Sequence, residues 1–198
     1  MKKIFLMIAL LFWFFPGIVF GYSVSLYDFT GDDAEVLIEI TGDGTDSITF
    51  EVQVQNPDYA DIRGVWFNFD SFPTGDLTVR GTDVTYYSFI DNGVDDLGNG
   101  VTINPEGSFD AGIEIGRQGI GGGNNFYSTS FTVSSTCHEN LNLGDYFGAR
   151  VTSVGDDDRE GSSKLIGTAT PVPESTTMLL LGTGLVGLSR ASRKKFKK

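Results

Sequence analysis

The sequence predicts an all-β fold, an antiparallel β-sandwich of the jelly-roll or immunoglobulin-like type. Short segments with a hydrophobic side chain at every second position run through the middle of the 198-residue chain. Clusters of Gly, Asp and Asn separate these segments, as turns do between neighbouring strands. Between the two ends of the chain, no stretch of about 12 residues shows the periodicity of an amphipathic helix. About nine or ten short strands joined by such turns are typical of a sandwich.

The clearest strand covers residues 47–55, where hydrophobic and polar side chains alternate without interruption. One face of this strand is expected to be buried and the other exposed to solvent. Residues 34–41 precede it, and residues 42–46 supply glycines and aspartates that tolerate a positive φ. The two segments are expected to form a hairpin.

Residues 61–70 alternate in the same way, and this places Trp66 and Asn68 on the face opposite the hydrophobic side chains. In residues 109–115, Asp110 and Glu114 are expected to point outward, and the hydrophobic side chains between them inward. The remaining predicted strands are residues 77–80, 84–90, 101–104, 127–133 and 146–154.

Charge is distributed unevenly along the chain. The formal net charge is −12, from 14 basic and 26 acidic residues. Two basic residues open the chain and six lie in its last nine positions, so residues 22–174 hold the other six, all 26 acidic residues and a formal charge of −20. This acidic body argues against nucleic-acid binding, which needs clustered Lys and Arg. It is compatible with cation binding or with simple solubility outside the cell.

The first 21 residues are predicted to be a secretory signal peptide. They combine a basic start, an apolar run broken only at Pro16-Gly17, and Val19 and Gly21 before the expected cleavage site. The alternative is an uncleaved anchor, but its apolar run is short and interrupted by proline. The acidic β-sandwich domain is therefore assigned to residues 22–168.

Residues suited to catalysis are few. Cys137 is the only cysteine, so no intramolecular disulfide is expected, and it stands beside the only histidine, His138. Adjacent side chains of an extended segment point to opposite faces, which makes the pair a poor nucleophile and base. The glycine-rich residues 116–125 lack the pattern of a phosphate-binding loop. The sequence predicts no enzyme, with a secreted glycoside hydrolase that uses paired carboxylates as an alternative.

Two acidic loops are candidates for a structural calcium ion. Asp156, Asp158 and Glu160 alternate as in the first half of an EF-hand loop, but Gly167 stands where that loop needs a bidentate carboxylate. Residues 91–96 form a second oxygen-rich loop, also without the full pattern. Calcium takes about six to eight oxygen ligands, which two converging loops would supply. The alternative is that both loops are solvated turns.

Aromatic side chains on the surface would allow carbohydrate to bind by stacking. Tyr86 and Tyr87 lie in the predicted strand at residues 84–90, and Trp66 lies on the less hydrophobic face of residues 61–70. Aromatic residues are also common in strands for reasons of packing, so core or cross-strand packing is the favoured interpretation for Tyr86 and Tyr87.

The C-terminal tail, residues 169–198, has three parts. Pro173 and Glu174 are followed by an uncharged run at residues 176–189 and then by a basic end at residues 190–198. As a helix the uncharged run would be roughly 21 Å long, which is short for a bilayer core of about 30 Å. The positive-inside rule would hold the basic end in the cytoplasm and the body outside. The basic residues expected to stop the chain at the membrane are Arg190, Arg193, Lys194 and Lys195.

This three-part tail resembles the PEP-CTERM sorting signal, which is found on exported proteins of Gram-negative bacteria that make exopolysaccharide. The resemblance implies a transient contact with the inner membrane and recognition of Pro173 and Glu174 by exosortase, a transpeptidase-like enzyme thought to remove the tail. Ser175 departs from the pattern, because the family has a second proline at that position. Weaker processing, or a protein that stays anchored by its transmembrane helix, is therefore the alternative.

The body is similar to a domain seen in other proteins with this tail, including cyanobacterial ones. The stretches that carry the similarity are residues 61–67, 109–114, 150–154 and 159–165. The resemblance implies a shared fold and location, and it implies no particular reaction.

Together these features predict a non-enzymatic, exported protein of the cell surface or the exopolysaccharide matrix, with a structural or adhesive role. Its expected partners are exosortase, the secretion machinery and exopolysaccharide, and calcium is the one cofactor that the acidic loops suggest. A carbohydrate-binding module is the first alternative, and a secreted glycoside hydrolase is the second.

Overall fold

A computed structural model describes residues 21–56, 60–104, 107–116, 126–155 and 160–169. These residues form ten β-strands and no helix, so none of them forms a helix long and apolar enough to cross a membrane. The strands are β1 (Gly21–Gly31), β2 (Glu35–Thr41), β3 (Ser47–Asn56), β4 (Asp61–Phe69), β5 (Leu77–Arg80), β6 (Val84–Val94), β7 (Phe109–Ile115), β8 (Ser128–Ser135), β9 (Leu143–Val154) and β10 (Gly161–Thr168). All neighbouring strands are antiparallel, which confirms the predicted all-β, antiparallel class.

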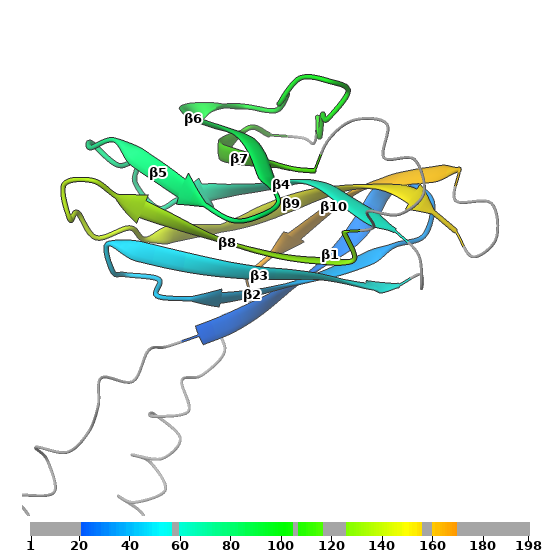
Figure 1. Cartoon of the computed structure of the whole chain (residues 1–198), viewed down its shortest axis with the longest axis horizontal. Coiled ribbons are helices and arrows are strands. Elements are labelled where there is room, and N and C mark those ends of the chain that lie inside the picture. The colour runs from blue at the N-terminus through cyan, green and yellow to red at the C-terminus, as the bar shows by residue number, and fades with distance from the viewer. Residues whose placement is uncertain (1–20, 57–59, 105–106, 117–125, 156–159, 170–198) are drawn as a thin grey trace, which may run out of the picture.

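The ten strands belong to one sheet, in the order β5-β8-β3-β2-β1-β10-β9-β4-β7-β6. The edge strands β5 and β6 follow each other in the chain and lie close together, so the sheet nearly closes into a barrel (Figure 1). The antiparallel strands that the sequence predicts thus form one sheet that curls over. Strand twist accumulates across a sheet of this width, and a wide twisted sheet must curl or split.

Strands β1 and β10 make the sheet continuous, and neither was predicted from the sequence. Together they join the half that contains β2, β3 and β8 to the half that contains β9, β4 and β7. The segment predicted as a strand at residues 101–104 is not one: it forms only an isolated bridge between Thr102 and Asp96. The other eight predicted strands and the hairpin between β2 and β3 are present.

The main hydrophobic core fills the inside of the curled sheet. Phe50 of β3 stacks on Phe67 of β4 with ring centroids 4.7 Å apart, and on Phe131 of β8 at 4.9 Å. Because β3 and β4 belong to different halves of the sheet, these rings join the two halves directly. Aromatic pairs of this kind add about 0.5–1.5 kcal/mol beyond the burial of their area.

A second, smaller core covers the outer face of β4, β7 and β9. Trp66 lies flat against Gly64, where an added Cβ would come within 2.5 Å of the indole. The residues packed around Trp66 come from the segment between β6 and β7 and its flanks: Val94, Leu97, Val101, Ile103 and Phe109. Both faces of β4 and β7 are therefore buried.

This second core corrects the expected orientation of Asp110 and Glu114, which were predicted to point into solvent. Asp110 is buried, and its carboxylate accepts hydrogen bonds from the backbone N–H of Phe69 (2.8 Å) and Asn92 (2.7 Å). Glu114 is also buried and forms an ion pair with Arg63. A buried carboxylate has to be paired or hydrogen-bonded in this way, because transfer from water is otherwise too costly.

Candidate functional site

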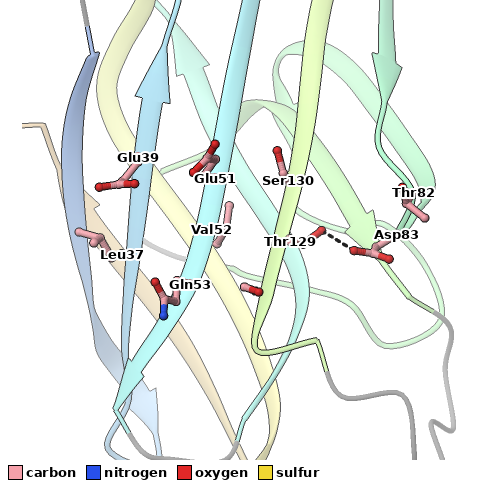
Figure 2. Close-up of a pocket in the computed structure, with 10 residues that line it drawn as sticks. Leu37, Glu39, Glu51, Val52, Gln53, Thr82, Asp83, Thr129 and Ser130 are labelled. Carbon is pink, nitrogen blue, oxygen red and sulfur yellow. Dashed lines mark hydrogen bonds between the residues drawn. The ribbon is translucent and has the colours of Figure 1, made fainter.

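A polar groove on the outer face of β2, β3 and β8 is a candidate site in the described residues (Figure 2). Its volume is about 460 Å³, within the range of about 300–1,000 Å³ for small-molecule sites. Its floor is made of side chains that alternate with the inward-facing hydrophobic residues of the same strands. The residues that present polar groups to it are Glu39, Glu51, Gln53, Ser128, Ser130 and Asp83.

Strand register brings the floor residues together in rows. Glu39 lies directly opposite Glu51, which lies directly opposite Ser130. One row along, Gln53 lies between Leu37 and Ser128. Residues directly opposite on neighbouring strands have Cβ atoms about 4.5–5.5 Å apart, and like charges in such positions are destabilising. The like charges of Glu39 and Glu51 therefore cost stability.

The groove differs from the rest of the same surface in the hydrogen bonds that its side chains make. Further along β3 and β8, Ser47 pairs with Ser134 (2.8 Å between the hydroxyl oxygens) and Thr49 with Thr132 (3.0 Å). Within the described part of the chain, the side chains of Glu39, Glu51, Gln53, Ser128 and Ser130 make no such bond, so their donors and acceptors are open to a ligand.

The turn between β5 and β6 forms one wall of the groove and is held firmly against β8. Thr129, which is buried, donates a hydrogen bond from Oγ1 to Asp83 Oδ2 at 3.0 Å, and Gly116 N–H donates to the carbonyl of Asp83 at 2.8 Å. Gly81 allows the close approach, since an added Cβ would lie 2.9 Å from the carbonyl oxygen of Ser130. The wall is thus fixed by contacts to both halves of the sheet.

A second hollow adjoins the same turn, at the seam between the edge strands β5 and β6. It has a volume of about 570 Å³ and is lined by Val79, Arg80, Gly81, Val84, Thr85, Tyr86 and Tyr87. Tyr86 is 49% exposed and Tyr87 39% exposed, so both predicted stacking residues lie on the surface. Residues of this one turn line both hollows: Thr82 and Asp83 line the groove, and Gly81 lines the second hollow.

Trp66, the third predicted stacking residue, lies elsewhere. Its side chain is 0% exposed beneath the segment between β6 and β7, so it has no face open to a sugar. The prediction that Trp66 stacks on carbohydrate is therefore wrong, because Trp66 packs in the second core. Its indole N–H finds no hydrogen-bond acceptor in the described residues.

The other predicted site residues lie mostly outside the described residues. This applies to Asp156 and Asp158 of the calcium loop, to Pro173 and Glu174, and to the basic end with Arg190, Arg193, Lys194 and Lys195. It also applies to residues 1–20 of the predicted signal peptide. Glu160 is described and exposed, just before β10. Within the described ranges, no three His, Cys, Asp or Glu side chains come together as metal ligands.

Cys137 and His138 make separate contacts after the end of β8. His138 Nδ1 lies 2.7 Å from Asp46 Oδ2, whereas the Cys137 thiol lies 3.3 Å from Ser135 Oγ. The neighbouring Glu139 accepts hydrogen bonds from the backbone N–H groups of Thr74 and Gly75, and these bonds lower the pKa of Glu139 below its usual value. These contacts tie the connection between β4 and β5 to the end of β8.

Sequence reasoning missed the groove, although part of its signal was present. Once residues 42–46 are recognised as a hairpin loop, the pairing of β2 with β3 places Glu39 opposite Glu51. The contributions of Ser130 and Asp83 depend on long-range pairing and had no local signal.

Comparisons with models of known protein families, with curated proteins and with solved structures find no match for this chain. Its function is therefore inferred from the chemistry of the groove and the adjoining hollow.

Proposed function

We propose that this chain is an exported protein of the cell surface or exopolysaccharide matrix whose β domain holds polysaccharide without cleaving it, in an adhesive role. The observation that carries the proposal is the open polar groove together with the exposed Tyr86 and Tyr87, which line a second hollow beside the same turn. Carbohydrate needs both kinds of surface, because its hydroxyl groups form hydrogen bonds while the faces of its rings are largely apolar.

The groove offers complementary partners for sugar hydroxyls. Ionised Glu39 and Glu51 accept hydrogen bonds only, whereas the amide of Gln53 and the hydroxyl groups of Ser128 and Ser130 both donate and accept. A pair of hydroxyls that donates to the two carboxylates would offset part of the like-charge repulsion between them. Tyr86 and Tyr87 supply amphipathic rings in the second hollow.

Binding and its location can be tested with a panel of neutral and acidic polysaccharides, including the exopolysaccharide of the native host. We expect retention by at least one of them, and weaker retention for Glu51→Gln, Tyr86→Ala and Tyr87→Ala. The matched control is Tyr27→Ala, because Tyr27 is 58% exposed and lines neither hollow. Retention that is absent from the whole panel, or equally reduced by Tyr27→Ala, would contradict the proposal.

Export and sorting rest on the two ends of the chain. The signal peptide and the tail that resembles PEP-CTERM support passage through the inner membrane and processing by exosortase near Pro173 and Glu174. Mass spectrometry of the protein from its native host would test this directly. A mature chain that still ends at Lys198 would refute processing and favour a permanent anchor, with Ser175 as the responsible departure.

The Glu39–Glu51 pair also supports a second candidate, a glycoside hydrolase, because retaining and inverting enzymes use two neighbouring carboxylates. Both side chains are exposed to solvent, whereas a general acid is favoured by a setting that excludes water. Release of reducing ends from a bound polysaccharide, abolished by Glu39→Gln with binding retained, would establish the hydrolase in place of the binding protein.

A further inference from the structure

Basic side chains gather in one row on the outer face of the other half of the sheet. Lys164 of β10 lies directly opposite Arg150 of β9, Arg150 lies opposite Gly64 of β4, and Gly64 lies opposite Glu114 of β7. Arg63, at an irregularity in β4, reaches the same row through its ion pair with Glu114. Half of the six basic residues in residues 22–174 thus lie together in a body whose formal charge is −20.

The one carboxylate in the row, that of Glu114, already forms an ion pair with Arg63. Arg63 is 5% exposed, its Nη1 donates to the carbonyl of Ile115 at 2.9 Å, and its Nη2 lies 3.5 Å from Glu114 Oε1. That Nη2 has no hydrogen-bond acceptor among the described residues. Burial lowers the pKa of Arg63, and the charges of Glu114 and Asp61 partly offset that effect. Glu114 therefore neutralises the charge of Arg63 and does not neutralise the charges of Arg150 and Lys164.

Arg150 and Lys164 face each other without a carboxylate between them in the described part of the chain. Arg150 Nη2 donates to Ser162 Oγ at 3.3 Å, and its buried Nε has no acceptor among the described residues. Burial lowers the pKa of both side chains, and the charge of Arg150 lowers that of Lys164 further. Two like charges directly opposite each other on neighbouring strands destabilise a sheet.

If the row served stability alone, each cation would be expected to pair with a carboxylate, since the acidic body contains many carboxylates. Among the described residues, the row instead has three cations, one carboxylate and two buried guanidinium nitrogens that have no acceptor. A carboxylate added from solvent beside Arg150 and Lys164 would offset the repulsion between their two charges. Arginine is well suited to that partner, because its planar guanidinium binds a carboxylate through two parallel hydrogen bonds.

We infer that Arg150 and Lys164 bind a carboxylate group of an acidic, uronate-bearing polysaccharide, with Arg63 and Glu114 as the buried pair behind them. This inference rests on the proposed function and names the class of polysaccharide. It also places a second contact, of opposite charge, on a different part of the sheet from the groove that contains Glu39 and Glu51.

The test measures the affinity of the full chain for oligogalacturonate and for a neutral oligosaccharide of the same length. Salt at about 0.15 M limits the repulsion from the rest of the acidic body to about 8 Å. We expect Lys164→Gln and Arg150→Gln to weaken oligogalacturonate binding about tenfold or more, and to leave binding of the neutral sugar unchanged. Lys164→Arg keeps the charge and is expected to keep the binding.

Charge reversal makes the test independent of any loss of folding. Lys164→Glu would pair with Arg150, so we expect a higher melting temperature together with lost oligogalacturonate binding. The inference would be overturned if the protein bound oligogalacturonate no more tightly than the neutral sugar, or if Lys164→Glu bound oligogalacturonate as well as the wild type does. In either case, binding of the neutral sugar would still support the proposed function. Failure to bind either sugar or any polysaccharide of the panel would overturn both.

Discussion

Replacing Trp66 with alanine tests the second core and the burial of the indole together. The side chain is 0% exposed, lies against Gly64 and Gly112, and is surrounded by Leu97 and Ile103, among other apolar side chains. Removal of a buried Trp or Phe costs about 3–5 kcal/mol, because the transfer energy is lost and a cavity remains. For a domain of about 150 residues each kcal/mol corresponds to about 2–4 °C, so we expect the melting temperature to fall by about 6–20 °C.

Trp66→Phe should cost less than Trp66→Ala. It leaves a smaller cavity and removes an indole N–H that has no acceptor in the described residues, and such a buried donor costs about 1–3 kcal/mol. Urea denaturation followed by circular dichroism would measure both variants without relying on the tryptophan signal.

Fluorescence offers an independent check on the same side chain. The chain has two tryptophans, Trp13 and Trp66, so the tryptophan fluorescence of the protein without its predicted signal peptide comes from Trp66 alone. We expect a blue-shifted emission that iodide quenches poorly and that sugar leaves unchanged. Efficient quenching, or a melting temperature of Trp66→Ala within about 2 °C of the wild type, would refute the reasoning.

Three further predictions concern charge. Backbone hydrogen bonds from Thr74 and Gly75 lower the pKa of Glu139 below its usual 4.5, so the stability that they give is present above about pH 4.5 and lost as pH falls through the lowered pKa. Glu139→Gln should therefore melt below the wild type at pH 7, and melting curves between pH 7 and 3 should show the difference shrink; a constant difference would contradict this. Glu51→Gln removes the repulsion from Glu39 and should stabilise the protein by about 0.2–1 kcal/mol in urea denaturation while it weakens polysaccharide retention. If Asp156, Asp158 and Glu160 hold calcium, the melting midpoint should be higher with calcium than with a chelator, and an unchanged midpoint would remove that site.

Most strands follow from alternation alone, and the two that were missed show its limits. β10 carries Ser163 on its buried side, where its hydroxyl donates to the carbonyl of Thr30 at 3.1 Å, so the strand shows no clear hydrophobic pattern. β1 has Val24 and Leu26 inside but Tyr27 and Phe29 exposed, and its register shifts between Asp28 and Thr30. Without β1 and β10, the predicted strands contain no link between the half of the sheet with β2, β3 and β8 and the half with β9, β4 and β7.

The outer faces were harder to predict than the inner ones. A strand pattern assumes one solvated face, and β4 and β7 break that rule because the segment between β6 and β7 covers them. Asp110 and Glu114 were therefore expected to point into solvent and Trp66 to stack on carbohydrate, although all three are buried. The groove depends in part on Asp83 and Ser130, which are brought together only when β5 pairs with β8.

The most direct test of polysaccharide binding in the groove is a two-dimensional NMR titration with a polysaccharide that the protein retains. We expect the largest shifts at the side-chain amide of Gln53 and at the backbone amides of Glu51, Ser130 and Tyr86. Shifts that are absent, or that cluster on β1 around Tyr27 instead, would contradict the account.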